Sequence, residues 1–140
     1  MLTQVLEWFP DRRFSLVGDG AYATKTLLGA LDPRVSFVGR LRGDPAVYDP
    51  RVPAPKPGQR GPRAKKGKRL PSPKEAAVKA DRKRTPVGPW WWHEVEVTVY
   101  GCCRRLKTLS YVVVWPTVLG LRPIRVVVVR DPEGNPFCVS

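Results

Sequence analysis

The pattern of apolar and polar positions predicts a strand–helix–strand unit near the N-terminus. Apolar residues recur at helical spacing through Leu2–Phe9, and Phe14–Gly18 is a short apolar run that ends in glycine. Helical spacing returns over Ala21–Leu31, and a second apolar run follows at Val35–Val38. This order predicts a βαβ unit whose two strands are parallel and buried on both faces.

The last third of the chain has a period of two and predicts an antiparallel β meander. Strict alternation over residues 93–100 predicts that Val95, Val97 and Val99 lie on the core face of a strand. Further strands are expected from valine-rich runs and from the turn composition before the last of them. They are Leu109–Trp115, Ile124–Val129 and, after a turn at Asp131–Asn135, Phe137–Val139.

Three consecutive tryptophans, Trp90–Trp92, precede the meander, and two interpretations of them stay open. They could form a platform on which nucleic-acid bases stack. They could instead form a lid over the meander core, since aromatic side chains bury large apolar areas.

The middle of the chain differs from both ends in composition and charge. The formal net charge is +13, and 13 of the 25 lysines and arginines lie in residues 51–84 with two of the 12 acids. Nine of the 16 prolines lie between Pro50 and Pro89. We therefore divide the chain into an α/β part at 1–44, a basic, proline-rich linker or arm at 45–91, and a β-rich part at 92–140.

The basic segment has two interpretations. It is either a solvated linker or an arm that binds phosphate groups, because a block of one charge sign is typical of polyanion contacts. The pattern also predicts a short helix at Lys74–Ala80 within it, with Ser72 as the N-cap.

Asp19 is the candidate for chemistry, because it follows the first strand and lies between two glycines. Open α/β sheets bind ligands at the carboxyl ends of their strands, and small neighbours let a metal or phosphate approach. Asp is also among the best helix N-caps, so Asp19 could simply cap the helix that follows. The residues alone leave both interpretations open.

No zinc site or disulfide framework is indicated, because the three cysteines and the single His93 lack the required spacing. No membrane span or secretory signal is recognisable, so a cytoplasmic setting without membrane contact is expected.

Five blocks in order resemble the DDE transposases of bacterial insertion sequences, in particular the DDE superfamily endonucleases. The blocks are LVGDGAYA, VSFVGRLRGDPAVYDP, RGPRAKKGKRLPSP, WHEVEVTVYG and RPIRVVVVRDPEG. The resemblance spans about Leu2 to Ser140 and implies a partial RNase H-like core (the βαβ unit), a basic linker and an antiparallel β-rich insertion.

The resemblance also implies a function for the intact parent protein. Such enzymes cut and join transposon-end DNA with two divalent cations, here expected to be Mg²⁺, held by two Asp and one Glu. Asp19 matches the second Asp and is the expected catalytic residue and metal ligand. The expected DNA-binding residues are Arg60, Arg63, Lys65, Lys66, Lys68 and Arg69.

The chain departs from the family pattern at the other two carboxylates, for which it has no matching position. We therefore expect a middle fragment of a catalytic domain, inactive alone, whose exposed strand edges favour association between copies. The competing hypothesis is a non-catalytic, basic nucleic-acid-binding protein in which Asp19 is only a cap.

Overall fold

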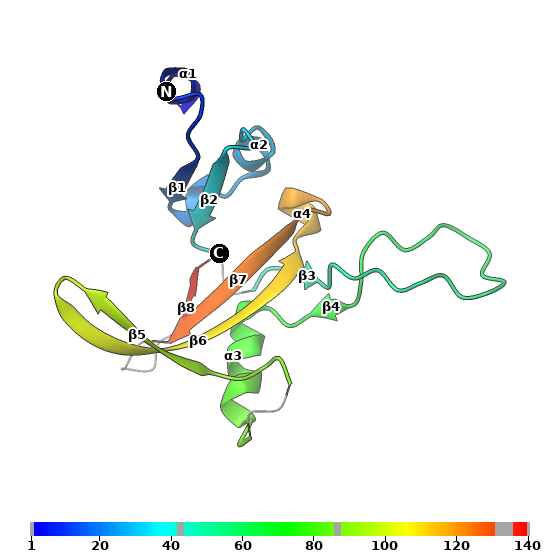
Figure 1. Ribbon diagram of the computed structural model, residues 1–140. Helices are drawn as coiled ribbons and strands as arrows, with labels where there is room; N and C mark the ends of the chain where they lie inside the picture. The colour runs from blue at the N-terminus through cyan, green and yellow to red at the C-terminus, as the bar shows by residue number, and fades with distance from the viewer. Residues whose placement is uncertain (1, 42–43, 86–87, 131–135, 140) are drawn as a thin grey trace.

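The computed structural model describes residues 2–41, 44–85, 88–130 and 136–139, except the side chains of Val99 and 136–139. Within these ranges the chain forms a two-stranded sheet and a six-stranded sheet (Figure 1). No helix of the described part is long and apolar enough to cross a membrane.

The N-terminal unit is the predicted parallel pair of strands. After helix α1 (Leu2–Trp8), strand β1 (Phe14–Gly18) pairs in parallel with β2 (Val35–Gly39), in register from Phe14 opposite Val35 to Gly18 opposite Gly39. The apolar runs and their parallel pairing are therefore confirmed.

The single helix predicted over Ala21–Leu31 is wrong, because two shorter elements replace it. A 3₁₀ turn, η1 (Gly20–Tyr22), comes first, and Ala23 then leaves the helical conformation with φ −74° and ψ 56°. Helix α2 (Lys25–Gly29) begins anew, and the Thr24 hydroxyl accepts a hydrogen bond from the Leu27 N–H at 3.3 Å. A side-chain oxygen at this position satisfies an N–H that has no partner inside the helix.

The prediction that β1 is buried on both faces is also wrong. Val17 is 76% exposed, and no residue of β1 is fully buried. In the described residues β1 pairs only with β2, so one of its two hydrogen-bonding edges is unpaired. The face that carries Ser15 and Val17 is exposed.

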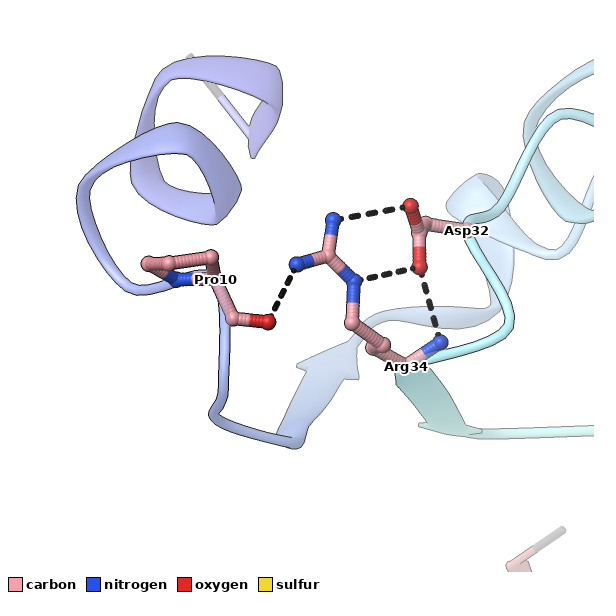
Figure 2. Close-up of polar contacts among 3 residues, drawn as sticks. All are labelled: Pro10, Asp32 and Arg34. Atoms are coloured by element: carbon pink, nitrogen blue, oxygen red, sulfur yellow. Dashed lines mark hydrogen bonds and ion pairs between the residues drawn. The ribbon is translucent and has the colours of Figure 1, made fainter.

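Arg34 joins the start of β2 to the segment that enters β1 (Figure 2). Its guanidinium donates to both carboxylate oxygens of Asp32, at 3.0 and 3.1 Å, and to the carbonyl of Pro10 at 2.8 Å. The hydrogen bond from Arg34 lowers the pKa of Asp32 below its ordinary value. Because Pro10 lies between α1 and β1, these bonds fix how the two strands enter the sheet.

Strand β6 is the longest element and the centre of the larger sheet. Every pairing in this sheet is antiparallel, as predicted for the meander. The strand order is β4-β3-β6-β7-β8, and β5 also pairs with β6. The members are β3 (Val47–Tyr48), β4 (Arg69–Leu70), β5 (His93–Val99), β6 (Cys102–Val114), β7 (Pro123–Arg130) and β8 (Pro136–Val139), with helix α4 (Pro116–Leu119) between β6 and β7.

The strands predicted at Leu109–Trp115, Ile124–Val129 and Phe137–Val139 correspond to β6, β7 and β8. The first of them begins at Cys102, seven residues before the apolar run, because β5 continues its ladder there. The turn predicted at Asp131–Asn135 lies outside the described residues.

Helix α3 (Pro73–Arg82) confirms the short helix and the cap predicted in the basic segment. The Ser72 hydroxyl accepts from the Glu75 N–H at 3.3 Å, and the Glu75 carboxylate accepts from the Ser72 N–H at 2.9 Å. This reciprocal pair is a capping box, and Pro73 occupies the first turn, where no N–H is needed.

The core lies between α3 and the strands β3, β6 and β7. Its members are buried, and half of them come from the two long strands β6 and β7. They are Leu41, Val47, Ala76, Ala77, Ala80, Leu109, Tyr111, Val113, Val126 and Val128. Three of them are alanines of α3, so a helix inside the predicted linker belongs to the core of the β-rich part. The boundaries at residues 44 and 91 stay a prediction.

Two of the three tryptophans pack on this core, which confirms the lid interpretation for them. Trp90 meets the ring of Tyr111 edge-on, with the centroids 4.9 Å apart. The Trp92 indole N–H donates to Asp81 at 3.0 Å, and the Arg130 guanidinium lies 4.8 Å from the centre of its ring. Rings held in this way are not free to stack on bases.

The prediction that Val95 faces the core is wrong, because Val95 is 41% exposed. Strand β7 reaches β6 only as far as Lys107, and beyond that point β5 and β6 form a two-stranded ribbon that extends away from the sheet (Figure 1). The opposite face of the ribbon carries an exposed ion pair between Glu96 and Arg105 at 3.1 Å. The side chain of Val99 lies outside the described part.

Asp81, near the end of α3, ties the helix to β7. Arg130 donates two hydrogen bonds to its carboxylate, one to each oxygen, and the second is 2.6 Å long. With the indole N–H of Trp92, the carboxylate thus accepts from three donors. The bonds from Arg130, more than those from Trp92, lower the pKa of Asp81 below its ordinary value.

We expect Leu109→Ala to lower the free energy of unfolding by about 2–5 kcal/mol, because it leaves a cavity at a side chain that is 1% exposed. Val95→Ala is the matched control on the same sheet and should change it by about 0.5 kcal/mol or less. Urea denaturation of both variants measures the difference. Equal losses would contradict the placement of the two side chains.

We expect Asp81→Asn to lower the free energy of unfolding at pH 7 by about 0.5–1 kcal/mol, since the carboxylate is partly exposed. The folded-state pKa of Asp81 is lowered, so the stabilisation is present above its ordinary pKa of 3.8. It is lost as the pH falls through the folded-state value.

Urea denaturation from pH 7 to pH 2 tests this dependence. The difference between the wild-type chain and the Asp81→Asn variant should stay constant from pH 7 down to about 3.8 and shrink as the pH falls further towards 2. Glu7→Gln, which removes an exposed carboxylate in α1, is the control. A difference for Asp81→Asn that stays constant down to pH 2 would contradict the ion pair.

Candidate functional site

Asp19 lies directly after the carboxyl end of β1, where the sequence places a ligand or a cap. The residue is exposed and extended, with φ −69° and ψ 159°, and its carboxylate accepts a hydrogen bond from the Gly20 N–H at 2.6 Å. Asp19 therefore caps the 3₁₀ turn that follows, which confirms the capping interpretation. Within the described residues its second oxygen accepts no hydrogen bond and faces solvent. Its role as a catalytic residue and metal ligand stays a prediction.

The backbone around Asp19 is closely packed against β2. A side chain at Gly20 would bring its Cβ within 2.7 Å of the carbonyl oxygen of Arg40, and one at Gly18 would meet the ring of Phe37 at 3.0 Å. Glycine is thus required for close approach at Gly20, whereas a Cβ at Gly18 would need a small shift of the Phe37 ring. The strand end that carries Asp19 is consequently held by its neighbour.

Arg40 is a candidate residue that the sequence analysis missed. It follows β2 directly, and its exposed side chain belongs to the same edge of the parallel pair as Asp19. The rule that parallel strands end at one edge of a sheet could have found it. A cation beside a carboxylate at this edge can attract an anionic substrate.

The residues around Asp19 do not by themselves suit a metal centre. The described part of the chain holds no group of three or more His, Cys, Asp or Glu that could bind a metal ion. Mg²⁺ gives up its water reluctantly and prefers several oxygen ligands in octahedral geometry, so one exposed carboxylate is a poor site. No metal-dependent step is derived for this chain alone.

The basic segment contains a long closed loop, the basic loop, from Asp49 to Lys68. The two-residue strands β3 and β4 pair at its base, the Asp49 N–H donates to the Lys68 carbonyl at 2.8 Å, and the Gly67 N–H donates to the Asp49 carbonyl at 3.1 Å. From this base the loop extends far from both sheets (Figure 1). It is therefore a loop with fixed ends rather than a linker between separate parts.

All six residues predicted to bind DNA are exposed and lie on the basic loop or on β4 at its base. They are Arg60, Arg63, Lys65, Lys66, Lys68 and Arg69. The six residues thus lie on one continuous stretch of the chain, and Asp19 does not belong to it. One of them has a second contact, since the Lys66 ammonium lies 3.9 Å from the centre of the Tyr48 ring. The DNA-binding role of all six stays a prediction.

A groove of about 640 Å³ continues from the base of the basic loop along α3. We call it the α3 groove, and its lining combines four basic residues, one acid and three apolar residues. The lining residues are Arg69, Leu70, Pro71, Lys74, Glu75, Val78, Lys79 and Arg82. Sequence reasoning predicted the helix but not the groove, because β4 is only two residues long and has no recognisable pattern.

Comparison with protein families gives one match. A family model described as DDE superfamily endonuclease matches residues 1–97. The match includes Asp19, the basic loop and α3, and it ends within β5. Neither a curated protein nor a solved structure matches the chain. The resemblance noted for the residues beyond 97 stays a prediction.

Proposed function

Because the chain belongs to the DDE superfamily endonuclease family, we propose that it is part of an insertion-sequence transposase that cuts and joins transposon-end DNA. The observation that carries the proposal is the exposed carboxylate of Asp19 at the carboxyl end of β1, inside the matched residues. Two further features support it: the parallel strand pair and the exposed cations of the basic loop.

In this proposal Asp19 supplies one oxygen ligand for a divalent cation. Members of the family generally use such ions, and Mg²⁺ is the one whose preference for carboxylate oxygen fits best. The described residues offer no second and third carboxylate beside Asp19. We therefore place the other two ligands of the proposed centre outside the described residues. The family resemblance is the basis on which we propose that the chain is a fragment of the intact enzyme.

The proposed partner of the basic loop is the DNA backbone. Seven lysines and arginines and one acid, Asp49, lie in the loop between residues 49 and 68. This stretch is rich in proline and glycine and contains neither helix nor strand, and its lysines and arginines are exposed. Contacts of this kind neutralise phosphates and carry little sequence preference.

The second candidate is a non-catalytic nucleic-acid-binding protein. The hydrogen bond from the Gly20 N–H to Asp19 favours it, since a cap explains this residue without a metal. Both candidates require the basic loop to bind DNA, and only the first requires Asp19 for cleavage.

We predict that the loop variant Arg60→Ala, Arg63→Ala, Lys65→Ala binds duplex DNA with a weaker salt dependence than the wild-type chain. Each phosphate contact contributes about −0.9 to the slope of log affinity against log salt, so three lost contacts make the slope shallower by about 2.7. Fluorescence anisotropy with a short duplex between 50 and 200 mM salt measures it.

The control variant for this experiment is Arg13→Ala, Arg104→Ala, Arg125→Ala. It removes the same charge from exposed positions before β1, on β6 and on β7, none of which belongs to the loop or to the α3 groove. Its slope should stay near that of the wild-type chain. A loop variant that behaves like this control would remove the loop from the DNA interface.

We predict that the 140-residue chain does not nick transposon-end DNA in Mg²⁺ or Mn²⁺, and that the same chain extended by its flanking reading frame does. In the extended protein, Asp19→Ala should abolish nicking, because a two-metal site loses a ligand. Asp11→Ala, an exposed acid before β1, is the control and should keep activity.

Gel electrophoresis of a supercoiled plasmid that carries the transposon end measures nicking by all four proteins. They are the isolated chain, the extended chain and the Asp19→Ala and Asp11→Ala variants of the extended chain. Nicking by the isolated chain would refute its status as a fragment. Full activity of the extended Asp19→Ala protein would instead favour the second candidate function for this residue.

A further inference from the structure

The α3 groove joins two features that no function above explains. Three cations on the exposed face of α3, Lys74, Lys79 and Arg82, line one side of it, and Arg69 lies at the end near the basic loop. The apolar residues of the lining are Leu70, Pro71 and Val78. A groove lined by both cations and apolar side chains suits a ligand that is both anionic and partly apolar.

The cations of the groove outnumber its acids, four to one. Among the described residues none of Lys74, Lys79 and Arg82 belongs to an ion pair. Glu75 is the one acid in the lining, and its carboxylate is engaged by the Ser72 N–H at the start of the helix. The groove therefore presents net positive charge to whatever lies in it.

The spacing along α3 suits a chain of phosphates. Lys74 and Arg82 are eight residues apart on one side of the helix, which corresponds to about 12 Å at 1.5 Å per residue. Val78 lies halfway between them in the same row and is 44% exposed. Cations at both ends of a row of this length can contact two phosphates of the same strand, with Val78 against the sugar–phosphate chain between them.

We propose that the α3 groove holds one sugar–phosphate strand of duplex DNA, as the continuation of the basic loop. Phosphates lie against Lys74, Lys79 and Arg82, and the deoxyribose groups lie on Val78 and its apolar neighbours. Arg69 connects the two surfaces, since it lies on β4 at the base of the basic loop and also lines the groove. This inference rests on the proposed DNA-binding function.

Duplex DNA is favoured over a single strand because no aromatic side chain lines the groove. Single-strand binding sites combine basic grooves with aromatic rings on which bases stack. The tryptophans that could have served here pack on the core instead. Contacts to the backbone of paired DNA need only cations and hydrogen-bond donors.

Three variants of the full chain, each lacking three cations, test the proposal. The groove variant is Lys74→Ala, Lys79→Ala, Arg82→Ala, and it is compared with the loop and control variants described above. Exposed positions are replaced throughout, so far-UV circular dichroism and the thermal midpoint should match the wild-type chain. The slope of log affinity against log salt for a duplex should become shallower by about 2.7 in the groove variant.

A groove variant that matches the control, while the loop variant loses its slope, would overturn the groove and leave the DNA-binding function intact. If none of the three variants differs from the wild-type chain, the DNA-binding function itself fails. A groove variant that loses affinity only for single-stranded DNA of the same sequence would also overturn the proposal.

A further variant tests the apolar part of the groove without removing a cation. Val78→Glu places a carboxylate between Lys74 and Arg82 and should weaken duplex binding through repulsion of phosphate. Val95→Glu adds the same charge at a valine of similar exposure on the ribbon and is the matched control. Equal duplex affinity of the two variants would contradict a DNA strand that crosses Val78.

Discussion

The alternation of side chains along β6 is the constraint on which the larger sheet depends. Every second residue of a strand faces the same side, so Leu109, Tyr111 and Val113 enter the core together while Val112 remains exposed. A slip of one residue would turn all three outward. The same strand pairs with β7 along one edge and with β5 and β3 along the other, so the ribbon and the base of the basic loop share its register.

The basic loop shows how a long, highly charged segment can belong to a folded protein. Loops of this length without secondary structure are uncommon in compact domains and usually have a function. The base is fixed by Val47 and Tyr48 of β3, which lies between β6 and the edge strand β4. Gly67 is required there because a Cβ would lie 2.4 Å from the Arg51 carbonyl oxygen. The cations of the loop repel one another because they lie close together outside the core. A bound polyanion relieves this repulsion.

Elements with a strong local signal could be predicted from the sequence. The capping box of Ser72 and Glu75 identifies the start of α3, and the apolar runs identify β1, β2 and β7. Strands β3 and β4 have two residues each and exist only because Val47 packs into a core built by distant strands, so no local pattern reveals them. Alternation at Val95 tells which residues share a face, but whether that face is covered depends on where β7 ends.

The sequence predicts the position of Asp19 at the end of β1. It does not predict the surroundings of Asp19, because these depend on the close approach of Gly20 to the Arg40 carbonyl. The two interpretations of this residue are compatible in physical terms. The cap engages one carboxylate oxygen through the Gly20 N–H at 2.6 Å and leaves the other directed to solvent. Hydrogen bonds to the side chains that ligate a metal commonly fix the orientation of those side chains. The cap thus orients the carboxylate at the strand end, and its free oxygen is the one that would bind the divalent cation proposed above.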